Sequence, residues 1–122
     1  MLNLLIVDDS SDLTDMIAQI YARRNFLISN AKSRQEIFSY LERIIPDLIF
    51  LDVLLEKDDG REICNELKSI PAYRHIPVIL MSGNPEKLSA YKTFLADDFM
   101  EKPFNMETIL SKARKYLGIR KS

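Results

Sequence analysis

Three aspartates in this sequence stand directly after apolar runs. Asp8 and Asp9 end the stretch LLIVDD at residues 4–9, and Asp52 ends LIFLD at residues 48–52. Carboxylates that share one cleft repel each other, so either the pKa of one rises or a cation binds between them. Oxygen ligands alone suit a hard cation such as Mg²⁺, and no Cys/His cluster in the sequence competes for a softer metal. The three aspartates therefore predict a magnesium site.

A hydroxyl and an amine follow two further apolar runs. Ser82 comes after VILM at residues 78–81, and Lys102 comes after a short run at residues 98–100. A carboxylate, a divalent ion, a lysine and a hydroxyl are the groups that phosphoryl transfer requires. The carboxylate can act as nucleophile, while the cations offset the charge of the phosphoryl oxygens. Taken singly, each of these residues is more often a turn, a helix cap or a solvated side chain, so it is their joint placement that favours a site.

Five apolar runs predict the strands that position these residues. Residues 4–7, 48–51 and 76–81 are continuously apolar, as strands covered on both faces are, and residues 26–28 and 98–100 form weaker runs. In an open parallel sheet, ligands bind at the carboxyl ends of the strands. We therefore expect the aspartates, the serine and the lysine to lie along one edge of the sheet.

The segments between the strands have the spacing of helices. Apolar residues recur at helical intervals over residues 13–21, 37–45, 63–70 and 106–117, and Asn84-Pro85 is typical of the start of a further helix. Strands that alternate with helices predict a parallel sheet with helices on both faces, that is, a doubly wound α/β fold.

Length and composition limit the class of protein. The chain has 122 residues, enough for one domain, and a formal net charge of −1, which does not favour direct binding to nucleic acid or to an anionic membrane. Cys64 is the single cysteine, so no internal disulfide is expected, and we interpret it as a packed thiol. His75 is interpreted as a loop residue. No leader is recognised and no run approaches the roughly 18 apolar residues of a membrane span, so the sequence predicts a cytoplasmic protein without membrane insertion.

The order and spacing of several short motifs resemble a receiver (CheY-like) domain of two-component response regulators. The motifs are IVDD at 6–9, LIFLD at 48–52, DG at 59–60, VILMSG at 78–83 and ADDFMEKPF at 96–104. The resemblance implies a five-stranded parallel sheet, doubly wound as (βα)5, with the flavodoxin-like strand order 2-1-3-4-5. It covers residues 1–122 as a single receiver domain, and because the chain ends soon after the fifth helix we expect no effector domain in it.

The resemblance also implies a role for each acidic residue. Asp52 matches the phosphoacceptor and one ligand of Mg²⁺. Asp9 matches the acid that binds the metal directly, Asp8 matches its partner, and the backbone carbonyl of Leu54 matches the third protein ligand. The implied cofactor is Mg²⁺.

Three further residues match the phosphoryl contacts and the switch. Lys102, before Pro103 with its cis-prone peptide bond, matches the lysine that contacts the phosphoryl group. Ser82 matches the hydroxyl that moves onto a phosphoryl oxygen, and Phe99 matches the aromatic side chain that turns inward with it. The chain departs from the family pattern at Glu56, where a proline is frequent, and at Leu95, where glycine is usual. The stretch from Ser82 to Lys102 is also shorter than usual, which predicts a short or irregular fourth helix.

The function that the resemblance implies is a phosphorylatable signalling switch. A histidine kinase or histidine phosphotransfer protein donates a phosphoryl group to Asp52 with Mg²⁺. The surface of the fourth helix, fifth strand and fifth helix then signals to a protein partner. Such a domain is a phosphoacceptor rather than an enzyme acting on other substrates. Two alternatives stay open: a Mg²⁺-dependent phosphatase that forms an aspartyl phosphate, and a docking module that works without phosphorylation.

Overall fold

A five-stranded parallel sheet forms the centre of the protein in a computed structural model that describes residues 2–20, 26–103 and 105–118. The strands are β1 (Leu2–Val7), β2 (Phe26–Ala31), β3 (Leu48–Asp52), β4 (Val78–Ser82) and β5 (Asp98–Glu101), and they lie side by side in the order β2-β1-β3-β4-β5. This arrangement confirms the predicted topology. β1 pairs with β2 on one side and with β3 on the other, so the direction of winding reverses between β1 and β3.

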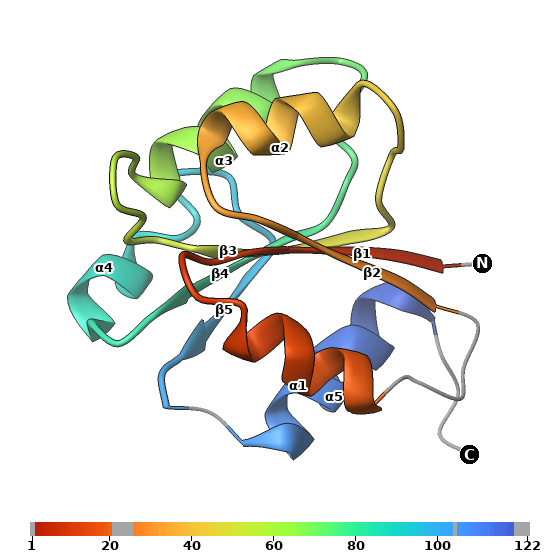
Figure 1. The fold of residues 1–122 in the computed structure, drawn as a ribbon. Helices are drawn as coiled ribbons and strands as arrows, with labels where there is room; N and C mark the ends of the chain where they lie inside the picture. The colour runs from red at the N-terminus through yellow and green to blue at the C-terminus, as the bar shows by residue number, and fades with distance from the viewer. Residues whose placement is uncertain (1, 21–25, 104, 119–122) are drawn as a thin grey trace.

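Helices cover both faces of this sheet (Figure 1). They are α1 (Asp12–Ile20), α2 (Arg34–Leu41), α3 (Gly60–Ser69), α4 (Pro85–Ser89) and α5 (Met106–Leu117). In Figure 1, α2 and α3 lie above the sheet, α1 and α5 lie below it, and α4 lies beyond its left edge. The loops that leave β1 and β3 turn at that same edge, which is the carboxyl end of the strands.

The two faces of the sheet bury alternate residues of each strand. Leu4 and Ile6 of β1 pack among side chains of α1 and α5, whereas Leu5 and Val7 pack among side chains of α2 and α3. All four are fully buried. Strands buried on both faces need a continuous apolar sequence, which explains the run LLIV ahead of Asp8.

The helix boundaries follow local capping. The side chain of Asn84 accepts a hydrogen bond from the backbone N–H of Glu86, and Gly118 ends α5 with φ of 67°. α4 has five residues, as expected for a short fourth helix. α2 ends at Leu41, four residues before the predicted end at Ile45. Ile45 precedes Pro46, which disfavours the helical backbone at that position.

Two residues that the sequence patterns include, Tyr21 of the first apolar helix stripe and Phe104 of the ADDFMEKPF motif, lie outside the described residues. Cys64 is fully buried, and burial raises the pKa of its thiol to about 12, as expected for a packed side chain. His75 is exposed in the turn between α3 and β4.

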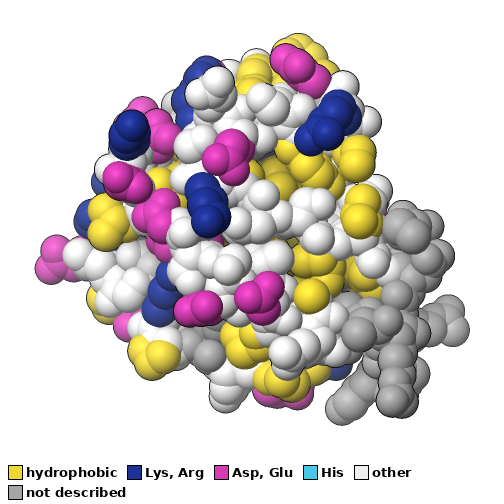
Figure 2. Space-filling model, viewed as in Figure 1, with side chains coloured by type: hydrophobic (Ala, Val, Ile, Leu, Met, Phe, Trp, Pro, Cys, Tyr) yellow, Lys and Arg dark blue, Asp and Glu magenta, His cyan; other side chains and the backbone are white. Residues whose placement is uncertain are grey.

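The face of the molecule shown in Figure 2 has no single charged field. Acidic and basic side chains are interspersed over the face shown in Figure 2, in keeping with the formal net charge of −1. None of the described helices is both long and apolar enough to cross a membrane.

Candidate functional site

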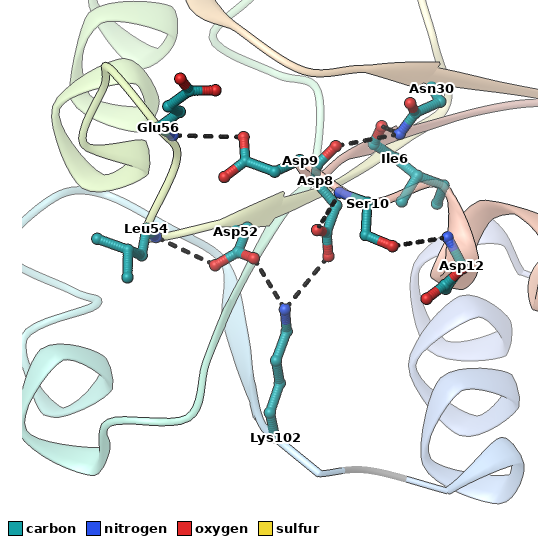
Figure 3. Close-up of polar contacts among 10 residues, drawn as sticks. All are labelled: Ile6, Asp8, Asp9, Ser10, Asp12, Asn30, Asp52, Leu54, Glu56 and Lys102. Atoms are coloured by element: carbon teal, nitrogen blue, oxygen red, sulfur yellow. Dashed lines mark hydrogen bonds and ion pairs between the residues drawn. The ribbon is translucent and has the colours of Figure 1, made fainter.

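Four of the predicted site residues meet at the carboxyl edge of the sheet. Asp52 ends β3 and Ser82 ends β4, while Asp8 and Lys102 directly follow β1 and β5. Asp8 and Asp52 are each 7% exposed, and Ser82 is 5% exposed. Figure 3 shows the carboxylates of Asp8 and Asp52 turned toward the end of the Lys102 side chain.

Each carboxylate oxygen of Asp52 accepts a hydrogen bond. The backbone N–H of Leu54 donates to Oδ1 at 3.0 Å, and Nζ of Lys102 lies 2.8 Å from Oδ2. Burial raises the pKa of Asp52 above its ordinary value and the negative charge of Asp8 adds to the rise, while Lys102 and the Leu54 amide only partly oppose it. Asp52 is therefore more basic than an exposed aspartate.

Lys102 lies between the two buried aspartates. Its Nζ is 3.2 Å from Oδ2 of Asp8 as well as 2.8 Å from Oδ2 of Asp52. Burial lowers the pKa of the Lys102 ammonium, but the hydrogen bonds and negative charges of Asp52 and Asp8 outweigh burial and raise that pKa overall. The backbone N–H of Lys102 donates to the carbonyl oxygen of Ser82 at 2.8 Å, which fixes the start of the lysine side chain at the edge of the sheet. The peptide bond from Lys102 to Pro103 is cis.

Asp9 does not join the other two aspartates. It is exposed, and its Oδ1 accepts a hydrogen bond from the backbone N–H of Glu56 at 3.3 Å. In Figure 3 the Asp9 carboxylate points toward Glu56 and away from Lys102. Within residues 2–20, 26–103 and 105–118, no group of three or more Asp, Glu, His or Cys side chains is arranged to hold a metal ion. Lys102 supplies the positive charge between Asp8 and Asp52, so these two carboxylates lie together without Asp9.

The chemical types of the donors near Asp9, rather than their arrangement here, suit Mg²⁺. The hydrogen bond to Glu56 brings Asp9 against the loop that follows β3, and that loop carries the backbone of Leu54. Carboxylate and backbone carbonyl oxygens are the ligands that Mg²⁺ prefers. The residues present here therefore offer a hard cation only oxygen atoms.

A pocket of about 370 Å³ opens beside Asp52. Leu54 is 67% exposed, and its side chain forms part of the wall. The pocket is lined by Asp52, Leu54, Ser82, Gly83, Asn84, Lys87 and Lys102. Lys87 was missed by reasoning from the sequence, because a lysine inside a short helix carries no motif of its own.

Ser82 and Phe99 lie in different surroundings. The hydroxyl oxygen of Ser82 accepts a hydrogen bond from the backbone N–H of Asn84 at 3.0 Å and faces the pocket. Phe99 is 39% exposed on β5, and its ring centroid lies 4.9 Å from that of Tyr91. Nζ of Lys112 lies 5.8 Å from the centroid of the Phe99 ring. Phe99 is therefore at the surface beside α5 rather than in the pocket.

Gly60 explains the DG motif in physical terms. Its backbone N–H donates to the carbonyl oxygen of Val53 at 2.7 Å, and a Cβ atom at this position would lie 2.0 Å from the carbonyl oxygen of Asp52. Only glycine allows α3 to begin this close to the end of β3. The loop after Asp52 is consequently folded tightly back against the strand.

Known proteins share both the sequence pattern and the fold of this chain. A family model described as the response regulator receiver domain matches residues 4–114. The sensory transduction protein LytT of Bacillus subtilis is 34% identical over 120 residues, which cover 95% of this chain and 48% of LytT. The response regulator PleD of Caulobacter vibrioides is 28% identical over 114 residues, which cover 91% of this chain and 25% of PleD. The chain spans between about a quarter and about half of the length of the curated relatives it matches.

Solved structures agree with the sequence match. The signal receiver domain of a signal transduction histidine kinase from Syntrophus aciditrophicus superposes with a TM-score of 0.84 at 30% identity, covering 100% of this chain and 95% of that one. The chemotaxis protein CheY4 of Vibrio cholerae superposes with a TM-score of 0.83 at 24% identity, covering 95% of this chain and 98% of that one. The second likeness concerns the fold alone.

Proposed function

The chain belongs to the response regulator receiver domain family, the signalling switches of two-component systems, and on that premise we propose that Asp52 is its phosphoacceptor. One observation carries the proposal. Asp52 is a buried carboxylate with a raised pKa that opens onto a pocket and keeps its charge partner, Lys102, 2.8 Å away. A carboxylate of higher basicity is a better nucleophile, and the cation beside it offsets the charge that a phosphoryl group brings.

The transfer from a phosphohistidine forms one bond and breaks one. A lone pair on a carboxylate oxygen of Asp52 attacks phosphorus as the P–N bond breaks, and the electrons of that bond remain on the imidazole nitrogen, which takes a proton. The backbone N–H of Leu54 holds the Oδ1 side of the carboxylate and so orients it during the attack. Lys102 stays charged because its pKa is raised, and it exchanges part of its contact with Asp52 for the incoming phosphoryl oxygens.

Asp8, Asp9, Asp52 and the carbonyl of Leu54 would hold Mg²⁺. When bound, the ion supplies positive charge that stabilises the phosphoryl oxygens in the transition state. Asp9 accepts a hydrogen bond from the backbone N–H of Glu56, and this contact holds Asp9 close to the loop that contains Leu54.

The phosphodonor is a histidine kinase or a histidine phosphotransfer protein. A second pocket, of about 580 Å³, lies on the α1 side of Lys102. Leu13, Met16 and Pro103 give this pocket apolar walls. A donor protein that packs there would place its histidine beside the phosphoacceptor edge.

Phosphorylation shifts the protein between two conformations. The modification adds a charge of about −1.5 to −2 and strong hydrogen-bond acceptors. The Ser82 hydroxyl, which faces the pocket, turns to a phosphoryl oxygen, and Phe99 leaves its exposed position beside Tyr91. The surface of α4, β5 and α5 then differs between the two states and selects the output partner.

Intact mass after incubation with acetyl phosphate tests the proposal. We expect the mass of one phosphoryl group to be added with Mg²⁺ present and much less without it, and Asp52→Asn to abolish the gain. Asp98→Asn is the matched control, because Asp98 is equally buried but lies away from the pocket. Undiminished labelling of Asp52→Asn would refute the assignment. No gain in the wild type would favour the docking module, and steady phosphate release from a generic phosphomonoester would favour the phosphatase.

A further inference from the structure

A second lysine lines the pocket beside Asp52. Lys87 lies on α4 and lines the same pocket as Asp52, Ser82 and Lys102. The two lysines come from different elements. Lys102 directly follows β5, whereas Lys87 lies within α4, which begins shortly after Ser82 at the end of β4.

The two lysines differ in how they are already engaged. Nζ of Lys102 is shared between Asp8 and Asp52. Among the described residues, eight pairs of charged side chains have a nitrogen and an oxygen within 4.0 Å of each other. Lys87 belongs to none of these ion pairs. Lys87 therefore lines the pocket without an ion-pair partner among the described residues.

The charge of Lys87 acts on the carboxylate of Asp59, and Asp59 has a closer partner. Arg61 contacts the Asp59 carboxylate at 2.8 Å and 3.2 Å, and the backbone N–H of Arg61 donates to it at 2.9 Å. These contacts lower the pKa of Asp59, and the charge of Lys87 adds a smaller effect at longer range. Because Arg61 satisfies Asp59, movement of Lys87 toward a new anion leaves no carboxylate without a partner.

We propose that Lys87 binds the phosphoryl group on Asp52, opposite Lys102, and that through this contact phosphorylation acts on α4 directly. The inference rests on Asp52 being the phosphoacceptor. With the phosphoryl group in place, that group, Asp8 and Asp9 carry about four negative charges, of which a bound Mg²⁺ and Lys102 would offset three. A lysine on the pocket wall is the protein group best placed to offset another.

The contact has a short path to the output surface. α4 spans five residues, and Leu88 is its buried side chain. Tyr91 follows in the next turn, where its ring lies against Phe99 with a centroid distance of 4.9 Å. Because α4 has a single buried side chain, a new contact between Lys87 and the phosphoryl group displaces the helix. That displacement moves the ring of Tyr91 relative to the ring of Phe99. This route reaches the aromatic pair without passing through Ser82.

Binding of beryllofluoride, a stable mimic of the phosphoryl group, tests the inference in the full chain with Mg²⁺. We expect Lys87→Ala to weaken binding roughly tenfold, as loss of one charge-assisted contact does, and Lys87→Arg to restore most of it. Lys87→Gln serves as a second variant without charge. The matched control is Lys92→Ala, which removes the same charge from an exposed residue of the same segment that does not line the pocket.

The dependence of binding on salt gives an independent readout. Lys87→Ala should weaken the salt dependence, whereas loss of a purely structural side chain should not change it. Equal affinity and equal salt dependence in wild type and Lys87→Ala would overturn the role of Lys87 while leaving Asp52 as phosphoacceptor. Failure of the wild type to bind beryllofluoride and to accept a phosphoryl group would overturn both. A loss of affinity in Lys92→Ala as large as in Lys87→Ala would also overturn it, because charge anywhere in the segment would then suffice.

Discussion

Asp52 and Asp98 are two aspartates of equal burial whose pKa values move in opposite directions. Each is 7% exposed, and each contacts at least one lysine. The pKa of Asp52 is raised and that of Asp98 is lowered. Burial raises both pKa values, but at Asp98 the hydrogen-bond donors outweigh that rise and at Asp52 they do not.

Asp98 is the better-satisfied carboxylate. Its Oδ1 accepts from the backbone N–H of Phe99 at 2.8 Å and lies 2.9 Å from Nζ of Lys112. Its Oδ2 accepts from the hydroxyl of Tyr116 at 3.0 Å, with Nζ of Lys115 at 3.6 Å. Burial acts to raise the pKa of Asp98, but these donors together outweigh it. Asp98 thus ties α5 to the sheet as a stable carboxylate.

Asp52 has fewer donors and a neighbour of like charge. Lys102 is divided between Asp52 and Asp8, and the Leu54 amide is the other donor to Asp52. Burial alone therefore does not make a carboxylate reactive. Incomplete compensation next to an open pocket separates a candidate nucleophile from a structural anchor.

The largest expected effect is on stability. Asp98→Asn should lower the free energy of unfolding by about 2 kcal/mol, because it removes charge from a hydrogen-bonded ion pair and leaves Lys112 without its carboxylate. Asp52→Asn should change it by less than about 0.5 kcal/mol or raise it, because it removes a poorly compensated charge beside Asp8. Urea denaturation of both variants measures the difference. Equal losses of stability in the two variants would contradict the difference in compensation between Asp98 and Asp52.

A polar side chain beside Asp52 should shorten the life of the phosphorylated form. Leu54 is exposed at the pocket and cannot orient water, whereas the side chain of Asn84 is occupied by the N–H of Glu86. We expect Leu54→Asn to accelerate dephosphorylation on the order of tenfold, less than a well-placed general base provides. Decay of the phosphorylated protein is followed by intact mass after the donor is removed. A decay no faster than that of the wild type would exclude shielding by Leu54.

Removing one donor from Asp98 should cost less than removing its charge. Tyr116→Phe deletes the hydroxyl that donates to Asp98 and to the carbonyl oxygen of Asp97. We expect a loss of about 1 kcal/mol in the free energy of unfolding and no change in labelling of Asp52. Thermal unfolding and intact mass measure the two effects. Reduced labelling would mean that the two regions are not independent.

The smallest expected effect is the dependence of stability on pH. The lowered pKa of Asp98 means that its contribution is present above the ordinary value of 3.8 and is lost as pH falls through the folded-state pKa. The raised pKa of Asp52 has the opposite sign. Its penalty is present at neutral pH and disappears as pH falls through the folded-state pKa toward 3.8.

The free energies of unfolding of Asp98→Asn and Asp52→Asn, measured by urea denaturation between neutral and acid pH, should therefore move toward the wild-type value in acid from opposite sides, each by less than about 1 kcal/mol over this range. Convergence from the same side would contradict the assigned shifts.

The fold was largely predictable from the sequence because it depends on local patterns. A strand buried on both faces requires a continuous apolar run, so the runs ending at Asp8 and Asp52 marked β1 and β3 and placed their aspartates at one edge. Short-range capping marked the start of α4 at Asn84 and the end of α5 at Gly118. The early end of α2 was missed, because the apolar stripe continues past the point where Pro46 disfavours a helix.

Local sequence patterns place these groups at the carboxyl edge of the sheet, whereas long-range packing sets which of them are in contact. Asp8 and Asp9 are neighbours in the chain, yet one contacts Lys102 and the other contacts the backbone of Glu56. Lys87 was unremarkable in the sequence and lines the pocket because α4 begins so soon after Ser82. Burial follows from the apolar pattern of nearby residues, but the charge and pKa of a carboxylate depend on donors that other strands and helices supply. For that reason the sequence could match Asp52 to a phosphoacceptor, whereas the role of Asp98 as an anchor of α5 emerged only from its contacts with Lys112 and Tyr116.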